Sequence, residues 1–125
     1  MTTTAAILFW ASMTTAPAIQ GEATYYDEGI MQRVIANRGL TWADGVALNR
    51  AGDLGRTIWL LWPDGTVDGP LPVVDCAQRG EHYRTRERQN RVVEVSAKLA
   101  QQRGFYGVGP VPVTVLFSEP LRGME

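Results

Sequence analysis

The chain has 125 residues, of which 20% are charged and 45% hydrophobic, and its formal net charge is −1. This length supports one domain with a real hydrophobic core, and the small net charge excludes a global field that would draw the protein onto nucleic acid. Cys76 is the one cysteine, which excludes an internal disulfide, and His82 is the one histidine. We therefore expect no histidine-based metal site, no Ser-His-Asp triad and no cofactor.

Residues 1–20 differ from the rest of the chain. Residues 7–13 form a short apolar run, and Ala16-Pro17-Ala18 follows it with the small-x-small pattern of a signal-peptidase site. We interpret residues 1–20 as an export signal cleaved after Ala18. No Lys or Arg precedes the run, so the alternative is an N-terminal arm or an extra edge strand. The run is too short to cross a bilayer as a helix, and we expect a secreted or periplasmic monomer with no membrane segment in its mature form.

Turn residues and period-two patterns predict short strands in the first half of the domain. Strands are expected at residues 21–26, 45–49 and 56–62, the last being the clearest. Pro63-Asp64-Gly65 directly after it is a turn signal. Between the first two strands, residues 30–37 have helical spacing, which predicts a short helix or an irregular lid.

The second half alternates strands, one loop and one helix. Strands are expected at residues 73–76, 91–95 and 113–117. Pro70 and Pro72 indicate a sheet edge or a strand start just before the first of these. Ser96 is a good N-cap for a helix over residues 97–103, and Gly104 suits the position after its end. About six short strands and one convincing helix predict an all-β protein, a small closed barrel spanning residues 21–117, with residues 118–125 as a tail.

Two acids interrupt the strands of the second half. Asp75 and Glu94 each stand within a run of β-branched residues, so each carboxylate is held at or near the barrel wall. If both face one cleft, they can divide the roles of proton donor and acceptor in glycoside cleavage. The alternative is structural, because an acid in a barrel wall often accepts backbone hydrogen bonds or pairs with an arginine. The neighbouring Cys76 has an apolar flank that predicts a buried, unreactive thiol.

Aromatic and polar side chains near these strands are candidates for substrate binding. Tyr26 is the best candidate for stacking on a sugar ring, and Trp62, beside the Pro63 turn, is expected to be exposed. For Trp59, within the strongest strand, we favour core packing. Asn49 either hydrogen-bonds a ligand or ends a strand.

An arginine-rich segment joins the strands that carry the two acids. Residues 78–91 hold five arginines, Arg79 among them, against two glutamates. Such a loop can bind an anionic wall polymer, although charge runs are more often solvated loops.

Six motifs in chain order resemble the double-psi β-barrel domain of RlpA-like and expansin-like proteins, a fold shared with family 45 endoglucanases. They are residues 21–26 (GEATYY), 46–49 (VALN), 64–66 (DGT), 73–75 (VVD), 93–96 (VEVS) and 111–115 (VPVTV). Together they cover roughly residues 21–117, and no single motif is specific. The resemblance implies a six-stranded double-psi β-barrel with one short α-helix.

The resemblance also implies a site. Glu94 stands where the endoglucanases have their general acid, and Thr24 and Asp75 match the binding face of expansins. Asn49 stands where RlpA-type transglycosylases have a histidine, which argues against their cleavage mechanism. We therefore expect a cell-wall-associated barrel that binds peptidoglycan or a cellulose-like polysaccharide without hydrolysing it. Two alternatives stay open: a weak glycan-cleaving enzyme with Glu94 as general acid, and a structural or interaction barrel.

Overall fold

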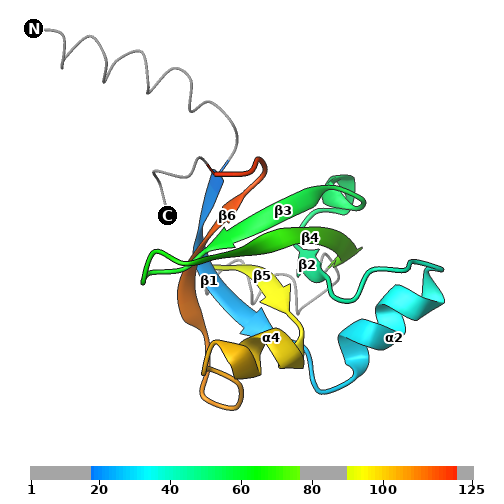
Figure 1. Cartoon of the computed structure of the whole chain (residues 1–125), viewed down its shortest axis with the longest axis horizontal. Helices are drawn as coiled ribbons and strands as arrows, with labels where there is room; N and C mark the ends of the chain where they lie inside the picture. Colours follow the sequence, from blue (N-terminus) through cyan, green and yellow to red (C-terminus); the bar gives the residue numbers. More distant parts are fainter. Residues whose placement is uncertain (1–17, 77–89, 121–125) are drawn as a thin grey trace, which may run out of the picture.

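The computed structural model describes residues 18–76 and 90–120. The described residues form six strands that close into a barrel in the order β1-β5-β2-β4-β3-β6 (Figure 1). The strands are β1 (Ala18–Tyr25), β2 (Val46–Leu48), β3 (Thr57–Leu61), β4 (Val67–Cys76), β5 (Arg91–Val95) and β6 (Val111–Leu116). Two helices, α2 (Ile30–Asn37) and α4 (Ala97–Gln102), and the 3-10 turn η1 (Ala51–Asp53) complete the described fold. The predicted all-β barrel is confirmed, with a second helix in addition to the one expected.

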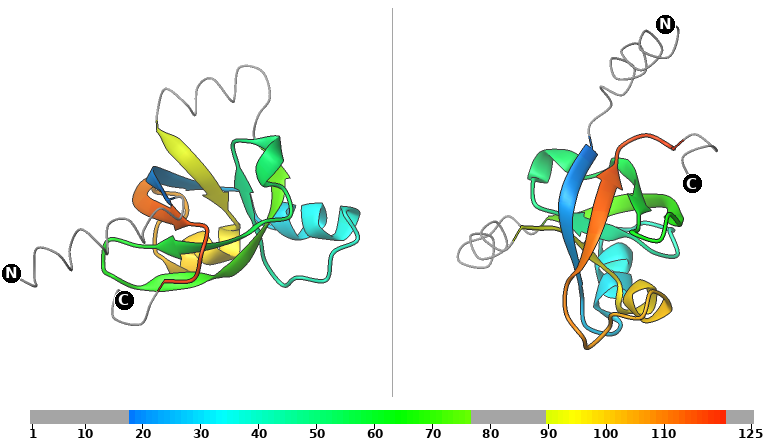
Figure 2. Two further views of the ribbon diagram at one scale, coloured as in Figure 1. Left: turned by 90° about the horizontal axis from the view of Figure 1, so that it is seen from above. Right: turned by 90° about the vertical axis from the view of Figure 1, so that its left-hand side faces the viewer.

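The strand directions make the barrel a mixed one. β1 is parallel to β5 and β2 is parallel to β4, whereas the other four neighbouring pairs are antiparallel. Exchanging β1 with β4, β2 with β5 and β3 with β6 reproduces the same ring of neighbours and the same directions. The two halves of the chain are therefore topologically equivalent and interlock through the two parallel pairs, as a double-psi barrel requires. Figure 2 shows one of the antiparallel pairs, β1 and β6, side by side.

The core follows the period-two pattern of the strands. Alternate residues of a barrel strand point inward, and the inward residues here are mostly β-branched. They include Val46, Leu48, Ile58, Leu60, Val93, Val95, Val113 and Val115, all of them buried. Leu99 and Ala100 of α4 and the following Phe105 join the same cluster, so α4 packs against the apolar interior of the barrel.

The predicted N-cap of α4 and the glycine after its end are confirmed, and the helix ends at Gln102, one residue before the predicted end. The Ser96 hydroxyl oxygen accepts a hydrogen bond from the Leu99 N–H at 3.1 Å, which is the N-cap interaction. Gly104 has a φ of 79°, and the Phe105 N–H donates to the Ala100 carbonyl at 3.0 Å. This left-handed glycine turns the chain so that Phe105 enters the core.

We expect Ser96→Ala to destabilise the fold by about 1–2 kcal/mol, since it removes a buried N-cap. Ser96 is completely buried, and its hydroxyl also donates to Asp44 Oδ2 at 3.0 Å. Urea denaturation followed by circular dichroism would measure the change. Ser96→Thr keeps the hydroxyl and is the matched control, and equal stabilities of Ser96→Ala and the unmodified protein would contradict the capping role.

Residues 30–37 form a regular helix rather than an irregular lid. The buried residues of α2 are Met31 and Ile35, which pack against Val74 of β4 together with Tyr26 and Val34. The buried face of this helix follows the i, i+4 spacing of Met31 and Ile35. α2 therefore packs on the outer side of the barrel at β4, and it stands beside the barrel in Figure 1.

Three strands begin earlier than predicted, and one of them is β6, which begins at Val111 rather than at residue 113. β1 begins at Ala18, earlier than the expected Gly21, because residues 18–20 pair with Thr114–Leu116 of β6. β4 runs through both prolines instead of starting there. The register of β3 against β4 shifts between Ile58 and Leu60, so that two residues of β4, Gly69 and Pro70, lie opposite the single residue Trp59. Such a bulge tolerates a residue that has no N–H to give to the ladder.

The burial of two tryptophans, Trp59 in β3 and Trp62 directly after it, differs from the prediction. Trp62 is buried, with 5% of its surface exposed, whereas Trp59 is only half-buried. Ile58 and Leu60 point into the core, so alternation puts Trp59 on the outer face, over the space left by the missing side chain of Gly69. The predictions of an exposed Trp62 and a core Trp59 are therefore wrong. Cys76, predicted to be buried, is partly exposed.

Within residues 18–76 and 90–120, neither helix has the length and apolar character needed to cross a membrane.

Candidate functional site

The strand register brings the two candidate acids onto one line across the barrel wall. Thr24 of β1 is opposite Glu94 of β5, Glu94 is opposite Ala47 of β2, and Ala47 is opposite Asp75 of β4. These four residues, hereafter the acid row, cross four neighbouring strands. Asp75 and Glu94 are two strand spacings apart, which corresponds to about 10 Å between their Cα atoms.

The acid row lies on the outer face of the barrel. Val46 and Leu48, on either side of Ala47, belong to the core, and so do Val93 and Val95, on either side of Glu94. Since successive side chains of a strand point to opposite faces, Ala47 and Glu94 point outward, and their register partners Thr24 and Asp75 share that face. The prediction that both acids line one face is consistent with this register.

Asp75 is the acceptor at the centre of a small polar network. The Tyr26 hydroxyl donates to Asp75 Oδ2 at 2.7 Å, and the Cys76 N–H donates to Oδ1 at 2.9 Å. Arg38, directly after α2, donates to Oδ1 at 3.4 Å and forms an ion pair with it. The Tyr26 bond has the short length typical of a hydroxyl donating to a carboxylate. Asp75 therefore acts as a hydrogen-bond acceptor for three different groups in this arrangement.

The other polar members of this face are more buried. Thr24 and Glu94 each expose 9% of their surface, and Ser96, two residues after Glu94, exposes none. Asp44, just before β2, accepts hydrogen bonds from the Ser96 hydroxyl at 3.0 Å and from the Gly45 N–H at 2.9 Å. Carboxylates and hydroxyls from β1, β4 and β5 thus share this face of the barrel with Asp44 and Ser96, which lie just outside the strands.

Sequence reasoning missed Asp44 and Arg38. An acid beside a glycine directly ahead of an apolar strand was the available signal for Asp44. Gly45 itself leaves no room for a side chain, because an added Cβ would lie 2.8 Å from Val74 Cγ2. Arg38 carried no such signal, since its pairing with Asp75 depends on how α2 packs against β4.

Asn49 lies beside the acid row but is engaged in the fold. Its side-chain amide donates to the Arg91 carbonyl at 2.8 Å and so ties the end of β2 to the start of β5. Two roles were predicted for Asn49, and this contact supports the structural one, in which Asn49 ends a strand.

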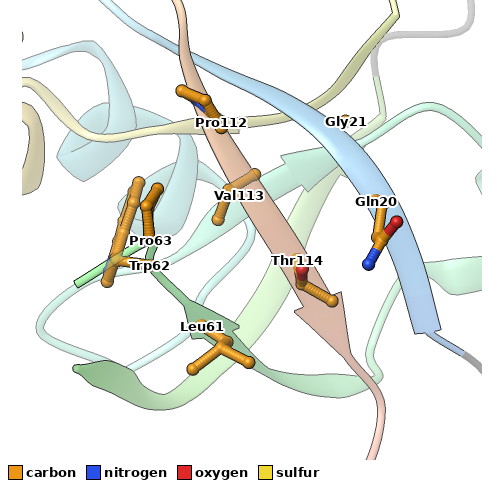
Figure 3. A pocket seen from close by; sticks show the side chains of 8 residues that line it. All are labelled: Gln20, Gly21, Leu61, Trp62, Pro63, Pro112, Val113 and Thr114. Atoms are coloured by element: carbon orange, nitrogen blue, oxygen red, sulfur yellow. The ribbon is translucent and has the colours of Figure 1, made fainter. Parts of the chain in front are cut away.

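Trp62 is on the other side of the barrel. β3 and β6 lie opposite β2 and β5 in the ring, so the structure does not bring Trp62 to the two acids. Its indole N–H donates to Asp68 Oδ2 at 2.8 Å, and its ring packs 5.8 Å from that of Phe105. Trp62 contributes to a shallow pocket of about 380 Å³ between β1, β6 and β3, as Figure 3 shows. The pocket is lined by Gln20, Gly21, Leu61, Trp62, Pro63, Pro112, Val113 and Thr114.

Several predictions fall on residues that the structure does not describe. Arg79 and most of the arginine-rich loop belong to residues 77–89, which lie outside the described residues. Of the predicted export signal, residues 1–17 lie outside them as well. Among the residues that are described, no three His, Cys, Asp or Glu side chains gather closely enough to hold a metal ion.

The fold and this face define a class: a closed, six-stranded mixed β-barrel that carries acidic and hydroxyl side chains from β1, β4 and β5 on its outer face. Compared with models of known protein families and with curated proteins, the sequence matches no family model and no curated protein significantly.

Proposed function

We propose that this protein binds a cell-wall polysaccharide at the acid row and does not cleave it. The observation that carries the proposal is that Asp75 and Glu94 share an outer face with the hydroxyls of Thr24 and Tyr26. Carboxylates accept hydrogen bonds from sugar hydroxyls, and hydroxyl side chains can both donate and accept. The motif resemblance to RlpA-like and expansin-like barrels supports the same proposal, since Thr24 and Asp75 match the binding face of expansins, and so does the export-type N-terminal sequence.

Two features favour binding over cleavage. Asp75 already accepts hydrogen bonds from a hydroxyl, a guanidinium and a backbone N–H, so both of its oxygens are engaged as acceptors. Asn49 occupies the position of the transglycosylase histidine, and an amide cannot transfer a proton as an imidazole does.

The alternative function is weak glycan cleavage with Glu94 as general acid. Under this alternative, Glu94→Gln abolishes the release of soluble sugars while the circular dichroism spectrum is unchanged, because the amide keeps the shape but not the proton. Unchanged release by a folded Glu94→Gln protein would exclude the general-acid role.

The third possibility, a purely structural or interaction barrel, draws support from the Arg38–Asp75 ion pair. Arg38 is 44% exposed, however, and ion pairs at such positions contribute little stability. The pair is therefore weak enough for a ligand to displace.

The test is a pulldown of the 125-residue protein with insoluble peptidoglycan and with cellulose, with released sugars assayed in the supernatant. We expect binding to at least one polymer without sugar release. Release would favour the enzyme, and binding to neither polymer would leave the structural barrel. The same pulldown with Asp75→Ala tests the site itself. Its matched control is Glu119→Ala, which removes an exposed acid outside the acid row.

A further inference from the structure

The residues of the acid row point outward, yet those in the middle of the row are buried. An outward residue of a barrel wall is exposed unless another part of the chain covers it. Ala47, between two core residues of β2, points outward but exposes only 1% of its surface, and Glu94 is also buried. Something therefore lies over the middle of the acid row.

Tyr26 is placed to cover it. Its backbone continues β1, where its N–H donates to the Val95 carbonyl at 2.8 Å, and its hydroxyl reaches Asp75 of β4 at 2.7 Å. β5 and β2 lie between β1 and β4 in the sheet, and Tyr26 packs with Val74 and α2, which places its side chain on the same outer face as the acid row.

The same carboxylate joins this cover to α2. Arg38, at the end of α2, pairs with Asp75, and Tyr26 packs against the apolar cluster of Met31, Ile35 and Val74. The Tyr26 hydroxyl and the Arg38 guanidinium are thus both directed to Asp75, while the Tyr26 ring packs on the apolar cluster.

We propose that Tyr26 is a displaceable cover of the acid row, and that a hydroxyl-rich ligand opens it by replacing the Tyr26 hydroxyl on Asp75. The exchange substitutes one hydroxyl donor for another, so the carboxylate never loses a partner. This inference rests on the proposed function for its ligand, but the cover itself can be tested without one.

The first experiment measures access to Glu94 in the absence of ligand. Carbodiimide-driven labelling of carboxylates with an amine, read by mass spectrometry, is compared for the full-length protein, Tyr26→Phe and Tyr26→Ala. We expect Glu94 labelling to rise about fivefold in Tyr26→Phe, because the net free energy of one ordinary hydrogen bond corresponds to about that factor. Labelling should rise further in Tyr26→Ala, which also removes the ring. Tyr25→Phe is the matched control, since it removes a neighbouring hydroxyl that accepts from the Gly107 N–H instead. Equal labelling in all four proteins would overturn the cover.

The second experiment measures the affinity of the same proteins for cellohexaose by calorimetry. Tyr26→Phe is expected to bind up to about fivefold more tightly, because the ligand no longer competes with the hydroxyl. Weaker or unchanged binding by Tyr26→Phe would overturn the displacement. If labelling rises but no protein binds the sugar, the cover stands, whereas the ligand exchange and the proposed function both fail.

Discussion

Trp62→Ala is expected to lower the free energy of unfolding by about 3–5 kcal/mol, as truncation of a buried aromatic side chain does. The indole is 5% exposed, packs on Phe105, lies under the Arg103 guanidinium and donates to Asp68. Its removal leaves a cavity between the core and the turn after β3. Urea denaturation followed by far-ultraviolet circular dichroism measures the change without relying on tryptophan fluorescence.

Trp42→Ala provides the matched control for this prediction. Trp42 is 45% exposed, so the same truncation there should change stability by less than about 1 kcal/mol. Equal effects of the two substitutions would mean that Trp62 is solvent-exposed, as the sequence predicted, and would contradict its place in the core.

Asp75→Ala is expected to weaken glycan binding by about 10- to 100-fold, because a hydrogen bond to a charged group contributes about 1.5–3 kcal/mol. Asp75 accepts from both Tyr26 and Arg38, and the proposed ligand would take one of these places. The fold should lose only about 1 kcal/mol, since the network is partly exposed. Titration with cellohexaose and urea denaturation measure the two effects separately.

Glu119→Ala controls for a general loss of negative charge, because Glu119 is exposed beyond the end of β6. Similar binding by Asp75→Ala and Glu119→Ala would exclude Asp75 from the ligand site. A loss of binding that accompanies unfolding of Asp75→Ala would instead assign Asp75 a structural role.

The central strands were predictable because their signals are local. Period-two alternation around Ile58 and Leu60 and around Val93 and Val95 identifies β3 and β5, since one face of each strand must be apolar. The Ser96 cap and Gly104 define α4 through interactions within one helical turn. Signals of this kind do not depend on which other part of the chain lies nearby.

The boundaries that were missed depend on partners. Nothing local assigns Ala18–Gln20 to a strand, since their role comes from pairing with β6. Pro70 is an obstacle to a strand only if its partner strand requires an N–H there, and the bulge against β3 removes that requirement.

By itself, then, the sequence determined the all-β class, most of the strands, one capped helix and the two acids as candidates, because alternation, caps and turns act over a few residues. Only the tertiary structure decided that Thr24, Glu94, Ala47 and Asp75 form one row, that Tyr26 and Arg38 meet at Asp75, and that Trp62 is buried across the barrel. Each of these relations joins residues from different strands or helices. They follow from strand order and register, which no local pattern specifies.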